Sequence, residues 1–261
     1  MIFETHAHYD DDKFIFDREE LLGGELQAAG VDHVVNVAAD MESVNSTYEL
    51  TLKYDFIYGA LGVHPSSVSE LNDEKLAYIK KLTETNNKIR AIGEIGFDYY
   101  EENPDRNLQE KWFCAQTELA IEEDLPVIVH SRDAAEDTFR VISRYFDKRK
   151  DRLNGVIHCF SYSKEEAEKY IKLGFMIGVG GVVTFTNGRK LKETVAQIPL
   201  ESIVLETDSP YLAPVPYRGE RNTSMNIPLI ASEIADIKST DKDTVYRITN
   251  ENALRLYRLE K

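Results

Sequence analysis

The chain opens with Met1-Ile-Phe-Glu-Thr-His-Ala-His-Tyr-Asp10, a stretch that bears on both the fold and the function. A short apolar run, Ile2-Phe3, leads directly into His6 and His8. Side chains at positions i and i+2 of an extended backbone lie on the same face. The spacing therefore predicts two imidazoles at the end of one strand, directed at one cation. Two surface histidines in an N-terminal tail are the alternative.

The composition is that of one large globular domain. The chain has 261 residues, of which 42% are hydrophobic and 30% charged, and this is enough for a core without disulfides. No linker, low-complexity tract or internal repeat divides it. We therefore expect a single domain over residues 1–261.

Charge and cysteine usage restrict the environment and the partners. The 31 Lys and Arg against 46 Asp and Glu give a net charge of −15, which argues against a broad electrostatic contact with nucleic acid. A nucleic-acid substrate held locally by metal ions remains open. Cys114 and Cys159 have no paired spacing and suggest core thiols in a reducing cytosol. No apolar run has membrane-spanning length, and a metal strand that begins at Met1 leaves no room for a signal peptide. We expect a cytoplasmic monomer or weak oligomer without membrane contact.

Strand-like and helix-like patterns alternate eight times along the chain. The predicted strands are Ile2–Glu4, His33–Ala38, Phe56–Gly62, Ile89–Ile95, Pro126–Val129, Gly155–His158, Phe175–Val179 and Ser202–Glu206. The predicted helices are Arg18–Ala29, Met41–Lys53, Asp73–Thr85, Asn107–Glu123, Ala134–Phe146, Lys164–Leu173, Leu191–Gln197 and Ile227–Ile237, with Thr244–Leu256 sealing the C-terminus.

Eight such units in about 250 residues predict an α/β fold of the (β/α)8 TIM-barrel type. A doubly wound open sheet is the alternative, and its first strand normally leads into a glycine-rich phosphate turn. Here the first strand leads into His6-Ala-His8, so the barrel is favoured.

Polar residues gather at the C-terminal ends of the predicted strands, where barrel enzymes carry their catalytic side chains. Five of the six histidines fall there, and only His33 does not. Any one of them alone could be a hydrogen-bonded core residue, but five together predict a metal site at the barrel mouth. The residues at this rim are His6, His8, His64, Glu94, His130, His158, Glu206 and Asp208.

Four imidazoles and two carboxylates are too many ligands for one four- or five-coordinate ion. They suit two divalent cations about 3.5–4 Å apart that share a carboxylate. The shared ligand should be Glu94, because its strand lies between the two histidine groups in chain order. The predicted ligands are His6, His8 and Asp208 for one ion, His130 and His158 for the other, and Glu94 for both.

Several longer motifs carry a family resemblance over nearly the whole chain. They are Thr5-His-Ala-His8, Gly62-Val-His-Pro65, Gly93-Glu-Ile-Gly-Phe-Asp-Tyr-Tyr100, His130-Ser-Arg-Asp133, His158-Cys-Phe-Ser161, Leu205-Glu-Thr-Asp-Ser-Pro-Tyr211 and Tyr217-Arg-Gly-Glu-Arg-Asn222. With these motifs the sequence resembles the TatD-type deoxyribonucleases, a branch of the amidohydrolase-like metal-dependent hydrolases.

The resemblance implies a TIM-barrel hydrolase that acts on phosphodiester bonds of DNA, with 3′-to-5′ exonuclease action on single strands. It implies divalent metal, typically Mg or Mn, with Zn or Ni possible in vitro. The family's ligands fall on the six residues assigned above. Three departures stand out: Glu4 replaces an Asp, Thr186 replaces a Lys, and Thr223-Ser224 replaces Glu-Pro.

Two cations would generate the nucleophile from a bound water. We expect Asp208 to accept its proton, Glu94 to bridge, and His64 to bind a phosphate oxygen or protonate the leaving group. A structural role for His64 stays open, as does the choice for Glu206 between supporting a ligand and filling the barrel top.

Phosphate contacts are expected from loop guanidinium groups, with solvated loop charges as the alternative. Basic residues near the rim are few. Arg132, Arg218 and Arg221 are the main candidates, and Arg189 and Lys190 are the others. We expect only two or three of the five to contact phosphate. Tyr99, Tyr100 and Tyr211 follow strand ends, where tyrosines either stack on a base or pack against loops.

Two other function classes stay open. The same site would serve a hydrolase of another ester or amide, for example an aminoacyl-tRNA or a small molecule. A non-enzymatic scaffold with a relic barrel is the second, although the intact ligand set speaks against it.

Overall fold

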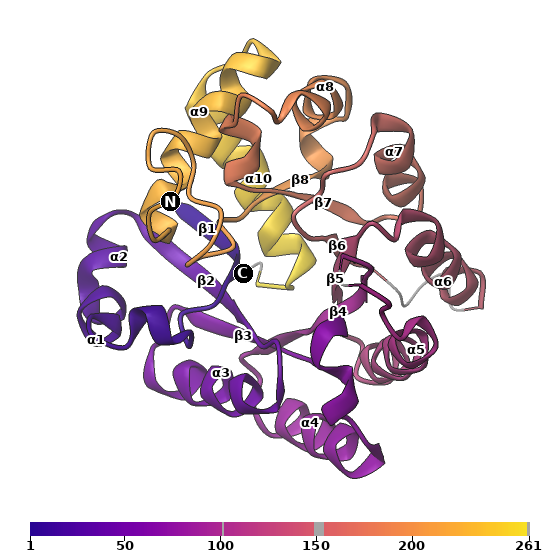
Figure 1. Ribbon diagram of the computed structural model, residues 1–261. Coiled ribbons are helices and arrows are strands. Elements are labelled where there is room, and N and C mark those ends of the chain that lie inside the picture. The colour runs from indigo at the N-terminus through magenta and orange to yellow at the C-terminus, as the bar shows by residue number, and fades with distance from the viewer. Residues whose placement is uncertain (101, 149–153, 260–261) are drawn as a thin grey trace.

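The computed structural model describes residues 1–100, 102–148 and 154–259 of the chain, and within them eight parallel strands follow one another around a barrel (Figure 1). The strands are β1 (Ile2–Ala7), β2 (Val31–Val37), β3 (Ile57–Leu61), β4 (Ile89–Asp98), β5 (Val127–Arg132), β6 (Gly155–Ile157), β7 (Met176–Val179) and β8 (Ile203–Leu205). The predicted TIM barrel is confirmed, and the open doubly wound sheet is excluded by the strand order.

The barrel closes where the chain's beginning meets the segment after β8. The amide of Asp208 donates to the carbonyl of His6 at 3.0 Å, and the amide of His8 donates to that of Ser209 at 2.7 Å. The hydroxyl of Thr5 adds a bond to the carbonyl of Leu205 at 2.9 Å. Three of the predicted ligands therefore lie on the backbone that closes the barrel.

The helices are α1 (Arg18–Glu20), α2 (Leu26–Ala28), α3 (Met41–Lys53), α4 (Asp73–Thr85), α5 (Arg106–Glu122), α6 (Ala135–Lys148), α7 (Lys164–Lys172), α8 (Arg189–Gln197), α9 (Ile227–Lys238) and α10 (Lys242–Leu256). Helices α1 to α9 lie around the outside of the barrel (Figure 1). The bounds predicted for α3 and α4 match at both ends. Each of these two begins at a capping side chain, because Asp40 accepts the amide of Ser43 at 2.8 Å and Asn72 that of Lys75 at 2.9 Å.

The single helix predicted over residues 18–29 is wrong. The structure has two short helical turns, α1 and α2, joined by a wider π-type turn, Leu21–Glu25. Gly24 inside that turn has a non-helical φ of 163°. A glycine pair has weak helix propensity, so Gly23-Gly24 is where a continuous helix is interrupted.

Side chains of the strands fill the barrel interior, as in other closed (β/α)8 barrels. This inner cluster includes Phe3, Val35, Ala60, Ala91, Ile128, Val156 and Val204, with Ala253, Leu256 and Tyr257 from the end of the chain. The Asn252 amide donates to the carbonyls of Leu200 and Ile203, at 3.0 and 2.8 Å. Helix α10 lies across the barrel end, which confirms the predicted sealing helix (Figure 1).

Three strands run further toward the rim than predicted. β1 extends to Ala7, β4 to Asp98 and β5 to Arg132, so His6 and His130 lie inside strands, whereas His8 follows one. His33 stands near the start of β2, stacked between Phe3 and Tyr58 at ring distances of 5.0 and 5.8 Å. Among the described residues, no helix has the length and apolar character needed to cross a bilayer.

Candidate metal centre at the barrel mouth

The end of β1 and the start of the segment after β8 bring three ligand candidates together. His6 Nε2 lies 3.2 Å from His8 Nε2, as expected for neighbours on one face of a strand. Asp208 Oδ1 lies 3.4 Å from His8 Nε2 and 3.8 Å from His6 Nε2. His158 joins them, with its Nε2 3.8 Å from the same oxygen.

Glu94 of β4 lies at the middle of the cluster and is buried. Its Oε2 is 3.5 Å from His6 Nε2, and its Oε1 is 2.7 Å from His130 Nδ1. The same Oε1 lies 3.6 Å from His158 Nε2 and 3.9 Å from His64 Nε2. The two oxygens of Glu94 thus face different groups of imidazoles, which is the arrangement expected of a shared ligand.

Hydrogen bonds on the outer side of the rings fix which nitrogen faces the cluster. His8 Nδ1 lies 2.7 Å from the carbonyl of Val37, which can only accept, so Nδ1 carries the proton and Nε2 is free to bind. At His64 the two ring nitrogens have the opposite roles. Its Nδ1 accepts the amide of Ser66 at 3.2 Å, so in the neutral ring Nε2 carries the proton and points a donor toward Glu94.

The carboxylates of the cluster stabilise positive charge on its imidazoles. Burial lowers the pKa of His158, but Glu206, Glu94 and Asp208 raise it to about 10 overall. Burial likewise raises the pKa of Glu94, yet His158, His64 and His130 hold it well below its ordinary value. His64 differs, because burial dominates and lowers its pKa to about 4. Carboxylates that hold protons on neighbouring imidazoles would equally stabilise a bound cation in place of those protons.

The donor set fits divalent metal. Imidazole nitrogens and carboxylate oxygens converge from several strands, and several pairs lie close without being paired by a well-aligned hydrogen bond. The described residues include close donor groups that could each hold an ion, and two matter here: His6, His8 and Asp208, and His64, Glu94 and His130. The first is the predicted group for one ion. The second joins His130 to His64, whereas the sequence suggested His158 as its partner.

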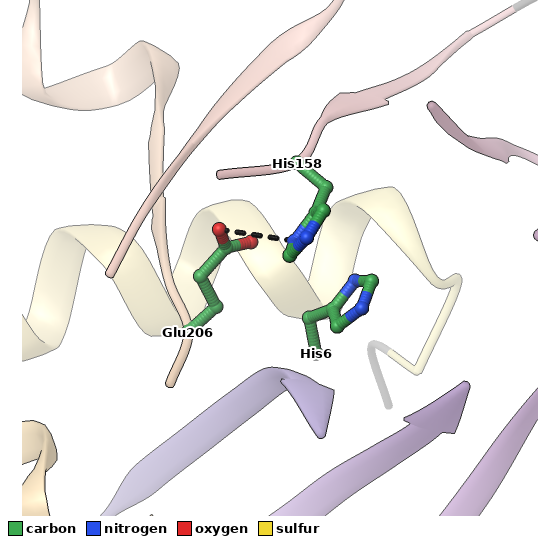
Figure 2. A group of neighbouring side chains, drawn as sticks. All are labelled: His6, His158 and Glu206. Atoms are coloured by element: carbon green, nitrogen blue, oxygen red, sulfur yellow. Dashed lines mark ion pairs between the residues drawn. The ribbon is translucent and has the colours of Figure 1, made fainter. Parts of the chain in front are cut away.

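Glu206 faces His158, and an ion pair joins the two side chains (Figure 2). Its Oε1 is 3.2 Å from His158 Nδ1 and accepts the amide of Cys159 at 2.6 Å. Its Oε2 is buried without a hydrogen-bond partner. A Cβ on Gly178 would stand 2.3 Å from that oxygen, so only glycine at this position leaves room for the carboxylate. His6 stacks on the other side of the His158 ring, with ring centres 3.5 Å apart.

A cavity of about 590 Å³ opens over the cluster, and Arg132 is the one Lys or Arg among its described lining residues. The structure does not bring Arg218 and Arg221 to this lining. Arg221 pairs with Asp17 and donates to the carbonyl of Lys13 at 2.8 Å, and Arg218 lies 4.5 Å from the ring of Phe185. The Arg189 side chain pairs with Glu193 on α8.

Sequence reasoning overlooked Asp98 and the acidity of the mouth. Asp98 ends β4, and its Oδ2 lies 3.0 Å from His130 Nε2. It stands in the motif Gly93–Tyr100, four residues after Glu94, and its position at a strand end was the available signal. Further lining carboxylates come from the loops after β1 and β2: Asp10, Asp11, Asp12, Asp40 and Glu42.

Two of the three departures from the family pattern meet in the structure. Glu4 is buried, and its Oε2 accepts the hydroxyl of Ser224 at 2.9 Å. The amide of Ser224 donates to the Tyr9 hydroxyl oxygen at 2.9 Å. A proline at 224 would offer neither donor, so the longer acid at 4 and the serine at 224 form one arrangement. Thr186 is exposed and is not among the lining residues.

Comparison with known proteins places this chain in a family. The family of TatD-related DNases matches residues 3–258. The chain is 38% identical to the uncharacterized metal-dependent hydrolase YabD of Bacillus subtilis, over 99% of this chain and 100% of that one. It is 31% identical to the 3′-5′ ssDNA/RNA exonuclease TatD of a Rahnella strain, over 99% of this chain and 98% of that one.

A solved structure shares the fold closely. The crystal structure of YjjV, the TatD homolog of Escherichia coli K12, superposes with a TM-score of 0.92 at 29% identity and covers 99% of this chain and 98% of its own. The barrel, the histidine-rich mouth and the full-length matches agree. The chain belongs to the TatD-related DNase family of metal-dependent hydrolases.

Proposed function

We propose that this protein hydrolyses phosphodiester bonds of DNA with divalent metal, removing nucleotides from the 3′ end of single strands. The observation that carries the proposal is the central position of Glu94, whose two oxygens face separate groups of imidazoles beneath an open cavity. The Rahnella relative named as a 3′-5′ ssDNA/RNA exonuclease, 31% identical over nearly the whole chain, supports this choice of substrate.

Two cations would be held by His6, His8 and Asp208 on one side and by His130 and His158 on the other, with Glu94 shared. His64 lies close to Glu94 and His130, but its Nε2 carries a proton, so we assign it no place among the ligands. Bound cations would acidify a water and polarise the phosphoryl group. Mg or Mn are the expected ions, and the abundance of imidazole explains why Zn or Ni should also bind in vitro.

Asp208 is suited to accept the proton of the attacking water. Burial raises its pKa, but His8, His158 and His6 lower it below the ordinary value, so the carboxylate is ionised at neutral pH. His64 presents its Nε2 proton to the cavity and is neutral, because burial lowers its pKa to about 4. It therefore serves as a hydrogen-bond donor to a phosphate oxygen rather than as a general acid.

Arg132 is the remaining phosphate contact at the mouth. Its guanidinium lines the cavity and has no ion-pair partner within the described part of the chain. Arg218 and Arg221 keep a predicted role only for a strand that reaches beyond the mouth, because Arg221 is already paired with Asp17.

One observation favours a second substrate class. The acidic side of the mouth, formed by Asp10, Asp11 and Asp12, would accept a cationic group. A hydrolase of an ester that carries an ammonium group, such as an aminoacyl-tRNA, would use the same centre. Product analysis on both substrates separates the two.

The predicted compartment is the cytosol, and the predicted state is a monomer or weak oligomer. Cys114 and Cys159 are both free thiols, in keeping with a reducing environment.

The test is digestion of single-stranded oligonucleotides labelled at the 3′ or the 5′ end, with each divalent metal in turn. Immediate release of the 3′ label as a mononucleotide, together with stepwise shortening of the 5′-labelled strand, is expected with Mg or Mn. Glu94→Gln is the inactive control. No cleavage with any metal, or hydrolysis of an aminoacyl ester alone, would overturn the proposal.

A further inference from the structure

A second cavity, of about 380 Å³, adjoins the metal centre. Three side chains line both cavities: His64, Asp98 and Arg132. His64 directs its Nε2 toward Glu94 on one side, while its Nδ1 contacts the Ser66 hydroxyl at 2.7 Å on the other. The two cavities therefore adjoin at these three side chains.

Much of the wall of the second cavity is apolar. Pro65 and Val68 are buried and belong to the short 3-10 helix Pro65–Glu70, and Leu108 comes from α5. Tyr100 is 63% exposed. Its ring lies 3.6 Å from the Arg132 guanidinium carbon, so an aromatic plane and a guanidinium plane stand together at the entrance.

The polar groups of this cavity include two carboxylates, those of Asp98 and Asp105, beside the Arg132 guanidinium. One oxygen of Asp105 accepts the amide of Leu108 at 3.0 Å, and the other accepts no hydrogen bond from a described residue, so it can accept a further N–H. The side-chain amide of Gln109 is hydrogen-bonded to the backbone of Asp98, at 3.0 and 3.1 Å, and is therefore part of the wall. A planar group with an N–H edge that can face Asp105 suits this lining.

The charges on the side of the mouth away from the second cavity indicate where a bound nucleic-acid strand leaves the metal centre. There the lining carries Asp10, Asp11 and Asp12, and like charges repel a phosphate backbone. Arg132 stands on the side of the second cavity. The charge distribution therefore directs the rest of a bound strand past Arg132.

We propose that the second cavity, walled by Tyr100, Arg132, Leu108 and Pro65, binds the nucleobase of the nucleotide next to the scissile phosphate. This inference rests on the proposed nuclease function and adds the group that the enzyme reads beside the reacting bond. The base stacks on the Arg132–Tyr100 pair, and its N–H edge faces Asp105.

The test uses single-stranded oligonucleotides that carry one abasic residue, placed on either side of the first scissile bond, compared with the intact strand. For the wild-type enzyme, kcat/KM should fall about tenfold for one of the two positions, as expected for the loss of one stacked base. Tyr100→Ala should reduce that loss to about twofold or less, whereas Tyr100→Phe should keep it.

Tyr78→Ala is the control, because Tyr78 is also an exposed tyrosine but lies on α4 and lines neither cavity. It should keep the abasic loss unchanged. Equal rates for intact and abasic strands, or a loss that persists in Tyr100→Ala, would overturn the subsite while leaving the nuclease proposal intact. No hydrolysis of the intact strand would overturn both.

Discussion

Replacing Glu206 by Gln should weaken metal binding while leaving the fold in place. The carboxylate stands 3.2 Å from His158 Nδ1 and contacts the backbone amide of Cys159. At an effective dielectric of about 20, unit charges at that distance interact by about 5 kcal/mol, an upper bound before desolvation. Supporting carboxylates behind metal-binding histidines are typically worth about 10- to 100-fold in metal affinity. The amide oxygen of Gln can still accept the Cys159 amide, so the loss should lie in that range.

The assay is a competition titration of metal-free protein against a chromophoric chelator, paired with thermal unfolding. Glu206→Gln should lose about 10- to 100-fold in affinity and stay folded. Gly178→Ala should reproduce the loss without removing a charge, because its Cβ would displace Glu206 Oε2. Glu233→Gln, on a surface ion pair with Lys192, is the control for a change of net charge. Affinity unchanged in Glu206→Gln would mean that this carboxylate only fills the barrel top.

Glu94→Gln should lower both metal affinity and turnover about 10²- to 10⁴-fold, since removing one member of a buried charge cluster costs about 3–5 kcal/mol. Asp208→Asn should retain the ion held by His130 and His158 yet abolish turnover, and equal metal loss in both variants would contradict the separation of bridge from base. The logarithm of KM for an oligonucleotide should change with log salt with a slope of magnitude about 0.7, one phosphate contact, because Arg132 alone lines the mouth. A slope magnitude of about 5 would reveal a basic groove that this structure lacks in its described part. Glu4→Asp and Ser224→Ala should show a coupling of about 1 kcal/mol in the free energy of unfolding, and additive effects would contradict their contact.

The fold and the rim were readable from the sequence because both follow from local periodicity. Eight strand–helix alternations predict the barrel, and in a barrel a residue at a strand's C-terminal end lies at the mouth wherever it falls in the chain. His6, His64, Glu94 and Asp208 therefore lie together although they come from distant segments. Strand ends were less accurate, because the backbone pairing that carries β1 and β5 outward is set by their neighbours.

The positions of the loop arginine side chains could not be predicted in the same way. Arg221 lies after a proline-rich loop, and its direction is decided by Asp17, a residue 204 positions away in the chain. No periodic pattern records such a pair. Asp98 was hidden for another reason, because its contact with His130 depends on the register between β4 and β5, in which Asp98 stands opposite Arg132.

Metal content distinguishes a centre of two cations that share Glu94 from a centre of one cation. Metal-free protein is loaded with excess Mn²⁺, freed of unbound ion and measured by elemental analysis, with Glu94→Gln treated alongside. Wild-type protein should approach two equivalents per chain, and Glu94→Gln should fall to one or fewer. Saturation of the wild-type protein at one equivalent would contradict the shared role of Glu94 and the two-cation centre with it.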